Sequence, residues 1–294
     1  MRDIFSNNIE ITEIISKYKV ILCDVWGVLH NGKDLFENAV ESLLKYSKSG
    51  GYIVLITNAP RPSIDVIKQL NQMGLNKNCY NLIVSSGDVT RFWLQSLNKT
   101  SLYHLGPERD KSIFLDLDIN FSNSKNCQSV LCTGLYNDET DVLDDYNDLM
   151  NLFLSKKIVM HCANPDLTVI RGDKTILCAG SLAEYYANKG GQVKYFGKPF
   201  EYIYEFAIKE VNKNNNFKVK KSEILAIGDG LKTDILGAGN FGIDSFFIIN
   251  GVHKNELNKR YNNNIFTQED FNNYMLEFYP DIKLPIATQE KLEW

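Results

Sequence analysis

The sequence predicts an α/β fold: a doubly wound parallel sheet into which a second α/β domain is inserted. Two observations predict it. Short apolar runs alternate with helical patterns at both ends of the 294-residue chain, and the middle of the chain departs from that rhythm. Alternation of strands and amphipathic helices is typical of parallel sheets. The length allows one large or two ordinary domains.

The first elements are two apolar strands, each followed by a helix with apolar residues at helical spacing. The first helix ends at Gly50-Gly51, and the second begins at Pro62 and ends near Gly74. Glycine after a helix and proline at its first position are the usual signals for these boundaries. The predicted elements are a strand over 20–23, a helix over 36–49, a strand over 52–56 and a helix from 62.

The last third of the chain resumes the same alternation. A further helix is expected from Thr267, because Thr267 and Asp270 have the spacing of a capping box. The predicted elements before it are a strand over 193–196, a helix over 201–211, a strand over 224–227, a helix over 233–239 and a strand over 245–249.

The middle segment is interpreted as the inserted domain. It contains four predicted strands and one helix whose aspartates form a solvated face. The predicted domains are a discontinuous core over 1–97 and 179–294 and an insert over 98–178. The insert's strands are expected at 101–105, 129–132, 157–160 and 175–178.

Composition excludes several classes of protein. The net charge is −4 and no basic run occurs, so nucleic-acid binding has no electrostatic support. No stretch of about 18 apolar residues predicts a membrane span, and the first residues resemble neither a signal nor a transit peptide. The six cysteines are scattered without a C-x-x-C pair, as in reduced thiols. We therefore expect a cytoplasmic protein with neither nucleic-acid nor membrane partners.

Chemically useful side chains follow four predicted strands. Asp24 ends the first strand, Thr57-Asn58 follows the second, Lys198 follows the strand over 193–196, and Asp229 and Asp234 follow the strand over 224–227. Parallel strands bring their carboxyl ends to one edge of a sheet, so these groups can converge. Carboxylates suit Mg²⁺, and Lys, Thr and Asn donors suit phosphate oxygens. Asp24 is then a candidate nucleophile that forms an aspartyl-phosphate.

In order and spacing these segments resemble the four motifs of the haloacid dehalogenase (HAD) superfamily, and within it the class IIA phosphatases. Further marks of that branch are Asn164-Pro165-Asp166, Gly180-Ser181-Leu182 and Gly197-Lys198-Pro199. The resemblance covers nearly the whole chain. It implies a Rossmann-like core with a mobile cap domain of the C2 type, inserted between the second and third motifs. It also implies that a homodimer forms through the cap.

The same resemblance implies the roles of the residues. Asp24 would be the nucleophile, Thr57 and Lys198 would hold the phosphoryl group, and Mg²⁺ would be held by Asp24, the backbone carbonyl of Trp26, Asp229 and Asp234. Three alternatives stay open. Asp234 can orient the metal site without touching the ion. Asn58 can bind phosphate or bond the loop backbone. Asp166 can face the substrate or only form a turn.

The sequence departs from the family's phosphatases at Trp26. The segment reads DVWGVLHNG, whereas those phosphatases have a second Asp, a general acid/base, in place of the Trp. General acid–base catalysis is worth roughly 10²–10⁴-fold, and His30 and Asp34 are nearby substitutes. The predicted function is a Mg²⁺-dependent phosphatase of small phosphorylated metabolites. The alternatives are a weakly active or non-catalytic binder of phosphate ligands and a dehalogenase-like hydrolase. Dehalogenases also carry an aromatic residue there, but they lack the Asp229 and Asp234 pattern.

Overall fold

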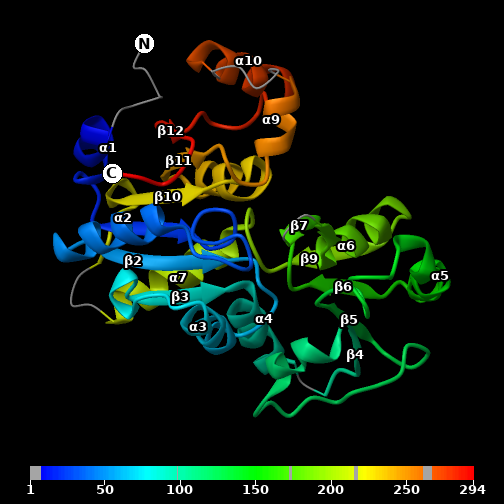
Figure 1. The fold of residues 1–294 in the computed structure, drawn as a ribbon. Helices are drawn as coiled ribbons and strands as arrows, with labels where there is room; N and C mark the ends of the chain where they lie inside the picture. Colours follow the sequence, from blue (N-terminus) through cyan, green and yellow to red (C-terminus); the bar gives the residue numbers. More distant parts are fainter. Residues whose placement is uncertain (1–7, 98, 172–173, 215–217, 261–266) are drawn as a thin grey trace. The chain divides into compact units, whose positions relative to one another are not determined.

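The computed structural model describes residues 8–97, 99–171, 174–214, 218–260 and 267–294 (Figure 1). These residues form two compact units. The first unit comprises the described residues of Met1–Ile56, Gln69–Ile83 and Tyr204–Trp294, and the second comprises those of Thr57–Lys68 and Val84–Ile203. Among the described residues, none of the helices combines the length and the apolar character that crossing a membrane requires.

A six-stranded sheet organises the first unit, and the chain winds away from its centre in both directions. Strands β2 and β3 follow β1 on one side, and β10, β11 and β12 follow it on the other. The pairs that β1 forms with β10 and with β2 are parallel. Ligands of such sheets bind where the strand order reverses, here at the carboxyl ends of β1 and β10. Across the sheet, the strands are β12 (Ala287–Gln289), β11 (Asp244–Ile248), β10 (Ile224–Gly228), β1 (Val20–Asp24), β2 (Tyr52–Thr57) and β3 (Leu82–Ser85).

The residues of β1 and β10 are all buried, which explains their continuous apolar sequences. The predicted strands and helices of both chain ends are found, with shifts of one to a few residues. The capping box of Thr267 and Asp270 begins α10 as predicted. The helices are α1 (Asn8–Ile15), α2 (Glu37–Lys48), α3 (Ser63–Gln72), α4 (Ser86–Gln95), α7 (Glu201–Asn214), α8 (Leu236–Phe241), α9 (Lys254–Arg260) and α10 (Gln268–Phe278).

The second unit has its own parallel sheet and a separate hairpin. The hairpin pairs β7 (Thr168–Arg171) with β8 (Lys174–Leu177). Helices α5 (Asn147–Ser155) and α6 (Ala179–Asn188) contribute Met150 and Tyr186 to one apolar core with residues of the sheet. In order across the sheet, its strands are β4 (Leu102–Leu105), β5 (Ser129–Cys132), β6 (Val159–Cys162) and β9 (Gln192–Tyr195).

Strand β9 corrects the predicted domain boundary. The sequence assigned this strand to the core sheet, but it pairs in register with β6, from Val159 opposite Gln192 to Cys162 opposite Tyr195. Helix α6 packs in the second unit as well, so a boundary at residue 178 is too early. The predicted strand over 175–178 is part of the hairpin instead. A four-residue strand with alternating exposure fits the edge of either sheet, which is why the sequence alone misplaced it.

Candidate active site

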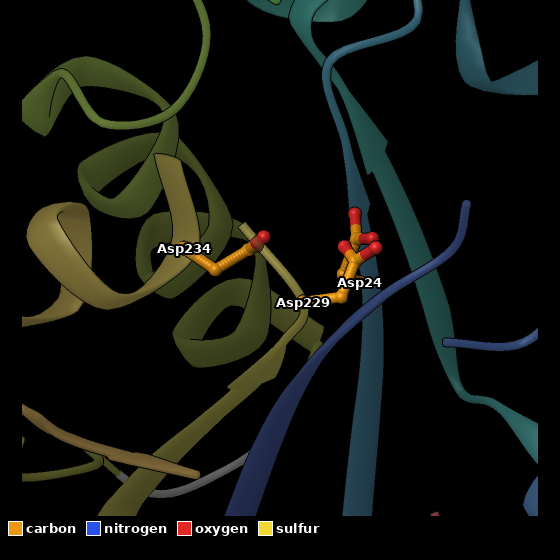
Figure 2. A group of neighbouring side chains, drawn as sticks. All are labelled: Asp24, Asp229 and Asp234. Carbon is orange, nitrogen blue, oxygen red and sulfur yellow. The ribbon is translucent and has the colours of Figure 1, made fainter. Parts of the chain in front are cut away.

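Three aspartates gather at the point where the strand order of the first unit reverses. Asp24 ends β1, Asp229 directly follows β10, and Asp234 lies in a π-helical turn over Leu231–Ile235. Each offers one carboxylate oxygen, and these three atoms lie within 4.8 Å of one another. Figure 2 shows the carboxylates of Asp24 and Asp229 side by side, with Asp234 pointing toward them from the turn. We call these three residues the acid cluster.

The acid cluster suits a hard divalent cation. Its members are only 5 %, 6 % and 4 % exposed, and buried carboxylates this close repel one another unless a positive charge lies between them. A set of carboxylate oxygens is the type of site that Mg²⁺ prefers. The structure therefore brings together the three aspartates that the sequence analysis assigned to the metal.

Backbone groups fix the orientation of Asp229. Its Oδ2 accepts a hydrogen bond of 2.7 Å from the N–H of Val252. A Cβ atom on either Gly27 or Gly251 would lie 2.0 Å from the same oxygen, and Gly27 has a φ of +88°. Both positions therefore need glycine, because only glycine lets the backbone come this close to the carboxylate.

Asp234 is oriented within its own turn. Its Oδ2 accepts hydrogen bonds from the N–H of Gly230 at 3.1 Å and from the hydroxyl of Thr233 at 3.4 Å. A Cβ on Gly228 would lie 2.1 Å from Asp234 Cγ. The glycines on either side of Asp229 thus leave room for the side chains of the following turn.

The indole of Trp26 packs on its own loop. The rings of Trp26 and His30 meet edge to face, with centroids 5.0 Å apart. A Cβ on Gly32, where φ is +90°, would lie 2.6 Å from two indole carbons. The loop is closed by a hydrogen bond of 2.8 Å from the N–H of Gly27 to the carbonyl of His30. The aromatic residue at the general-acid position is therefore a structural part of this loop.

Neither predicted substitute for the general acid is well placed. His30 is buried, and this burial lowers its pKa to about 4. Its Nδ1 accepts a hydrogen bond of 2.9 Å from the N–H of Gly32, so the ring is neutral near pH 7. Asp34 is exposed in a turn in which its N–H donates to Asn31 Oδ1 at 2.8 Å. Within the loop, neither group is an obvious proton donor.

In the second unit, the side chain of Asn58 binds the backbone of Lys198 on both sides. Asn58 Oδ1 accepts from the Lys198 N–H at 2.7 Å, and Nδ2 donates to the Lys198 carbonyl at 3.0 Å. The same Nδ2 donates to Asp166 Oδ1 at 2.8 Å. Both N–H donors of the amide are therefore engaged, by a backbone carbonyl 140 positions away and by a carboxylate, which is neither the local turn contact nor the phosphate contact considered for Asn58. We call Asn58, Asp166 and Lys198 the lysine cluster.

Asp166 lies in a turn, which was one of the two alternatives considered for it. Its side chain also belongs to the lysine cluster. Its N–H donates to Asn164 Oδ1 at 3.0 Å, and its carbonyl accepts from the Gly180 N–H at 3.1 Å. A Cβ on Gly197 would lie 2.4 Å from Asn58 Oδ1. These contacts connect the three family marks: Gly180 bonds Asp166, and Asp166 and Lys198 both bond Asn58.

Thr57 is the last residue of β2 and lies directly before Asn58. Thr57 and Lys198 are both buried, and Thr57 Oγ1 accepts from the Ala59 N–H at 3.2 Å. The acid cluster belongs to the first unit, whereas Thr57 and the lysine cluster belong to the second. Convergence of the two groups stays a prediction. For Lys198 it no longer follows from a shared sheet edge, because β9 belongs to the second sheet.

The loop that binds Asp229 was not predicted from the sequence. Gly251, Val252 and His253 follow the predicted strand over 245–249, at the same edge of the sheet as the acid cluster. Their position after a parallel strand was the available signal. Because the contribution of Val252 comes from its backbone, its residue type gave no indication of a role.

A crystal structure of a hydrolase from Brucella suis, described as haloacid dehalogenase-like, is 36 % identical to this chain. The match covers 96 % of this chain and 98 % of that one, with a TM-score of 0.83. The chain belongs to the haloacid dehalogenase-like hydrolase family. Family models agree: the model for haloacid dehalogenase-like hydrolases matches residues 21–120, and one for HAD-like hydrolases matches residues 195–269. The predicted superfamily and the α/β fold class are thus confirmed.

Two less similar solved structures share the fold, and one further relative is similar in sequence. The 4-nitrophenylphosphatase of Thermotoga maritima is 20 % identical, with a TM-score of 0.70 over 95 % of this chain and 96 % of that one. A glycerol phosphate phosphatase of Mycobacterium tuberculosis, solved with magnesium, is 18 % identical, with a TM-score of 0.68 over 99 % of this chain and 77 % of that one. The acid sugar phosphatase of Staphylococcus haemolyticus is 20 % identical over 81 % of this chain and 88 % of its own.

Proposed function

We propose that this family member is a Mg²⁺-dependent phosphatase of the class IIA type, acting on small phosphorylated metabolites through an aspartyl-phosphate on Asp24. The observation that carries the proposal is the acid cluster, whose three buried carboxylates lie within 4.8 Å of one another at the switch point of the sheet. Phosphatase activity in the names of relatives supports the reaction class, and the magnesium complex of one relative supports the metal.

In this proposal Asp24, Asp229 and the carbonyl of Trp26 hold Mg²⁺. Asp234 either completes the set or orients it. The bound cation supplies positive charge that lets a phosphate dianion approach the carboxylate of Asp24. The Val252 N–H bonds Oδ2 of Asp229.

The residues of the chain then divide the reaction between them. An Asp24 carboxylate oxygen attacks phosphorus; a new O–P bond forms while the ester O–P bond breaks and the alkoxide leaves. Thr57 and Lys198 hold the phosphoryl oxygens, and Asn58 holds the backbone of Lys198. Water then cleaves the aspartyl-phosphate, which releases inorganic phosphate and restores Asp24.

Trp26 limits the range of leaving groups in this proposal. Neither the indole nor the neutral, buried His30 can protonate an alkoxide, so substrates whose leaving groups depart as anions should react best. The same observation favours one second candidate, a protein that binds a phosphate ligand without turning it over. The acid cluster argues against a dehalogenase-like reaction, which needs no cation.

Further parts of the proposal concern the surroundings of the protein. The six cysteines all lie among the described residues, are buried and form no disulfide, which supports a reducing compartment such as the cytoplasm. We also propose a homodimer through the cap domain, in line with the class IIA resemblance. Neither a nucleic acid nor a membrane is expected as a partner, because the net charge is −4.

The test is hydrolysis of 4-nitrophenyl phosphate and an acyl phosphate with Mg²⁺ and with a chelator. We expect turnover that needs Mg²⁺ and that Asp24→Asn abolishes while the fold is retained. The matched control is Asp34→Asn, the same chemical change on an exposed Asp of the adjacent loop, which should leave turnover unchanged. Undiminished turnover in Asp24→Asn would exclude the aspartyl-phosphate. Phosphate binding without any turnover would favour the second candidate.

A further inference from the structure

His253 lies next to the residue that binds Asp229. It follows Gly251 and Val252 in the loop after β11, and its Nε2 accepts a hydrogen bond of 3.3 Å from the backbone N–H of Leu231. Its Nδ1 lies 3.4 Å from Glu256 Oε2. Because Nε2 accepts, the ring proton is on Nδ1 and is donated to the carboxylate of Glu256.

The imidazole is held in this orientation from several sides. The ring centroids of Phe247 and Tyr279 each lie 6.1 Å from that of His253. Glu256 is itself held by the hydroxyl of Tyr274 at 2.8 Å. Burial lowers the pKa of His253, which favours the neutral ring that Nε2 needs in order to accept.

Leu231 begins the π-helical turn that contains Asp234, and its N–H needs an acceptor from outside. The first N–H groups of a helical segment have no partner within it, and a Ser, Thr, Asp or Asn at the N-cap usually supplies one. Here the N-cap is Gly230, and a Cβ at that position would lie 2.0 Å from Thr233 Oγ1. No capping side chain fits at Gly230, and Leu231 is fully buried.

We infer that His253 is a positioning residue of the metal site: it caps the turn over Leu231–Ile235 from another loop and thereby fixes Asp234. The adjacent Val252 fixes Asp229, so one loop orients two of the three carboxylates. The inference rests on the proposed metal site. It assigns His253 no contact with the ion or with the substrate.

Two amide variants separate capping from packing. In His253→Gln the side-chain oxygen reaches about as far as Nε2 and can accept from Leu231. In His253→Asn it reaches only as far as Nδ1. Both variants remove the imidazole ring that packs near Phe247 and Tyr279, so the loss of packing is shared. Their difference therefore reports the hydrogen bond to Leu231.

The first measurement is amide hydrogen exchange of the metal-free protein over residues 229–236. We expect faster exchange in His253→Asn than in His253→Gln. The second is the Mg²⁺ dissociation constant by calorimetry without substrate. Groups that orient metal ligands typically contribute 10–100-fold to affinity, so we expect binding about tenfold weaker in His253→Asn and within about threefold of wild type in His253→Gln.

The outcomes distinguish this inference from the proposed function. Equal exchange and equal Mg²⁺ affinity in the two variants would overturn the role of His253 while leaving the metal site intact. If the wild-type protein bound no Mg²⁺, the proposed function would fail and with it the metal-positioning role; the exchange data would then decide only whether His253 caps the turn.

Discussion

The acid cluster and the lysine cluster are both buried and polar, but they are held in place differently. Backbone groups hold Asp229: the N–H of Val252 and two glycines whose missing side chains leave room for the carboxylate. A side chain holds Lys198, since the amide of Asn58 binds its backbone from both sides. Both arrangements need glycine, since a Cβ on Gly197 would lie 2.4 Å from Asn58 Oδ1, but only the second depends on one removable amide.

The largest expected effect follows from adding an atom at the acid cluster. In Gly27→Ala the new Cβ would lie 2.0 Å from Asp229 Oδ2, so the carboxylate has to move. Since a metal ion supplies several kcal/mol to such reactions, we expect turnover to fall by about 10³-fold or more. The control is Gly50→Ala, which has a similar φ of +90° but nothing within 4 Å of its Cβ. Similar losses in both variants would show that backbone strain, and not the contact with Asp229, is responsible.

The next largest effect is a gain of activity when Trp26 is replaced by Asp. If the missing general acid limits the wild type, Trp26→Asp should speed the hydrolysis of alkyl phosphates more than that of 4-nitrophenyl phosphate. A positioned acid gives roughly 10²–10⁴-fold, and we expect the lower end, about 10²-fold. The reason is that loss of the indole removes its contacts with His30 and Gly32. The ratio of kcat/KM values for the two substrates is the measurement. A wild type that hydrolyses both equally fast already has a proton donor.

A smaller effect is expected when the amide of the lysine cluster is removed. Asn58→Ala leaves the N–H and carbonyl of Lys198 without these partners, so the ammonium group loses its fixed position. Misplacement by about 1 Å can cost roughly 10²-fold, and we expect a 10–100-fold loss of kcat/KM with Mg²⁺ affinity unchanged. Asp166→Asn is the conservative control, because its oxygen can still accept from Asn58. Weakened Mg²⁺ binding in Asn58→Ala would contradict the separate roles of the two clusters.

The smallest effect concerns stability and a buried carboxyl group outside the acid cluster, Asp110 of the second unit. Burial raises the pKa of Asp110 from 3.8 to about 6, against the opposing influence of Arg109 and Arg61 and a hydrogen bond with Thr133. A raised pKa means that the folded state binds the proton more tightly than the unfolded state. The stabilisation that Asp110 contributes through this shift is therefore fully present below about pH 4. It is lost as the pH rises through about 6.

Asp110→Asn should remove most of this pH dependence. At 1.36 kcal/mol per pKa unit, the variant should be stabilised relative to wild type by about 2–3 kcal/mol at pH 8, less whatever its contacts with the arginines contribute. The difference should vanish near pH 4. Urea unfolding between pH 4 and pH 8 measures it. A difference that does not change with pH would show that Asp110 is not protonated in this range.

The sequence predicted the elements that present the acid cluster because strand burial and a terminal Asp are local signals. Asp24 follows the buried residues of β1, and Asp229 follows those of β10. Parallel pairing of the two strands then places the two carboxylates together. The role of Asn58 was left open, because its partner Lys198 is 140 positions away. Strand β9 was assigned to the wrong sheet for a similar reason, since pairing with β6 is a long-range choice. The capping role of His253 depends on a contact across 22 positions.

The central claim is that the acid cluster binds a metal ion. A crystal structure of the protein grown with Mg²⁺ tests this claim most directly. We expect an ion at about 2.0–2.1 Å from a carboxylate oxygen of Asp24 and from a carboxylate oxygen of Asp229, with the N–H of Val252 still bonded to Oδ2 of Asp229. A crystal saturated with Mg²⁺ that shows only water among the three carboxylates, or an ion bound elsewhere, would contradict it.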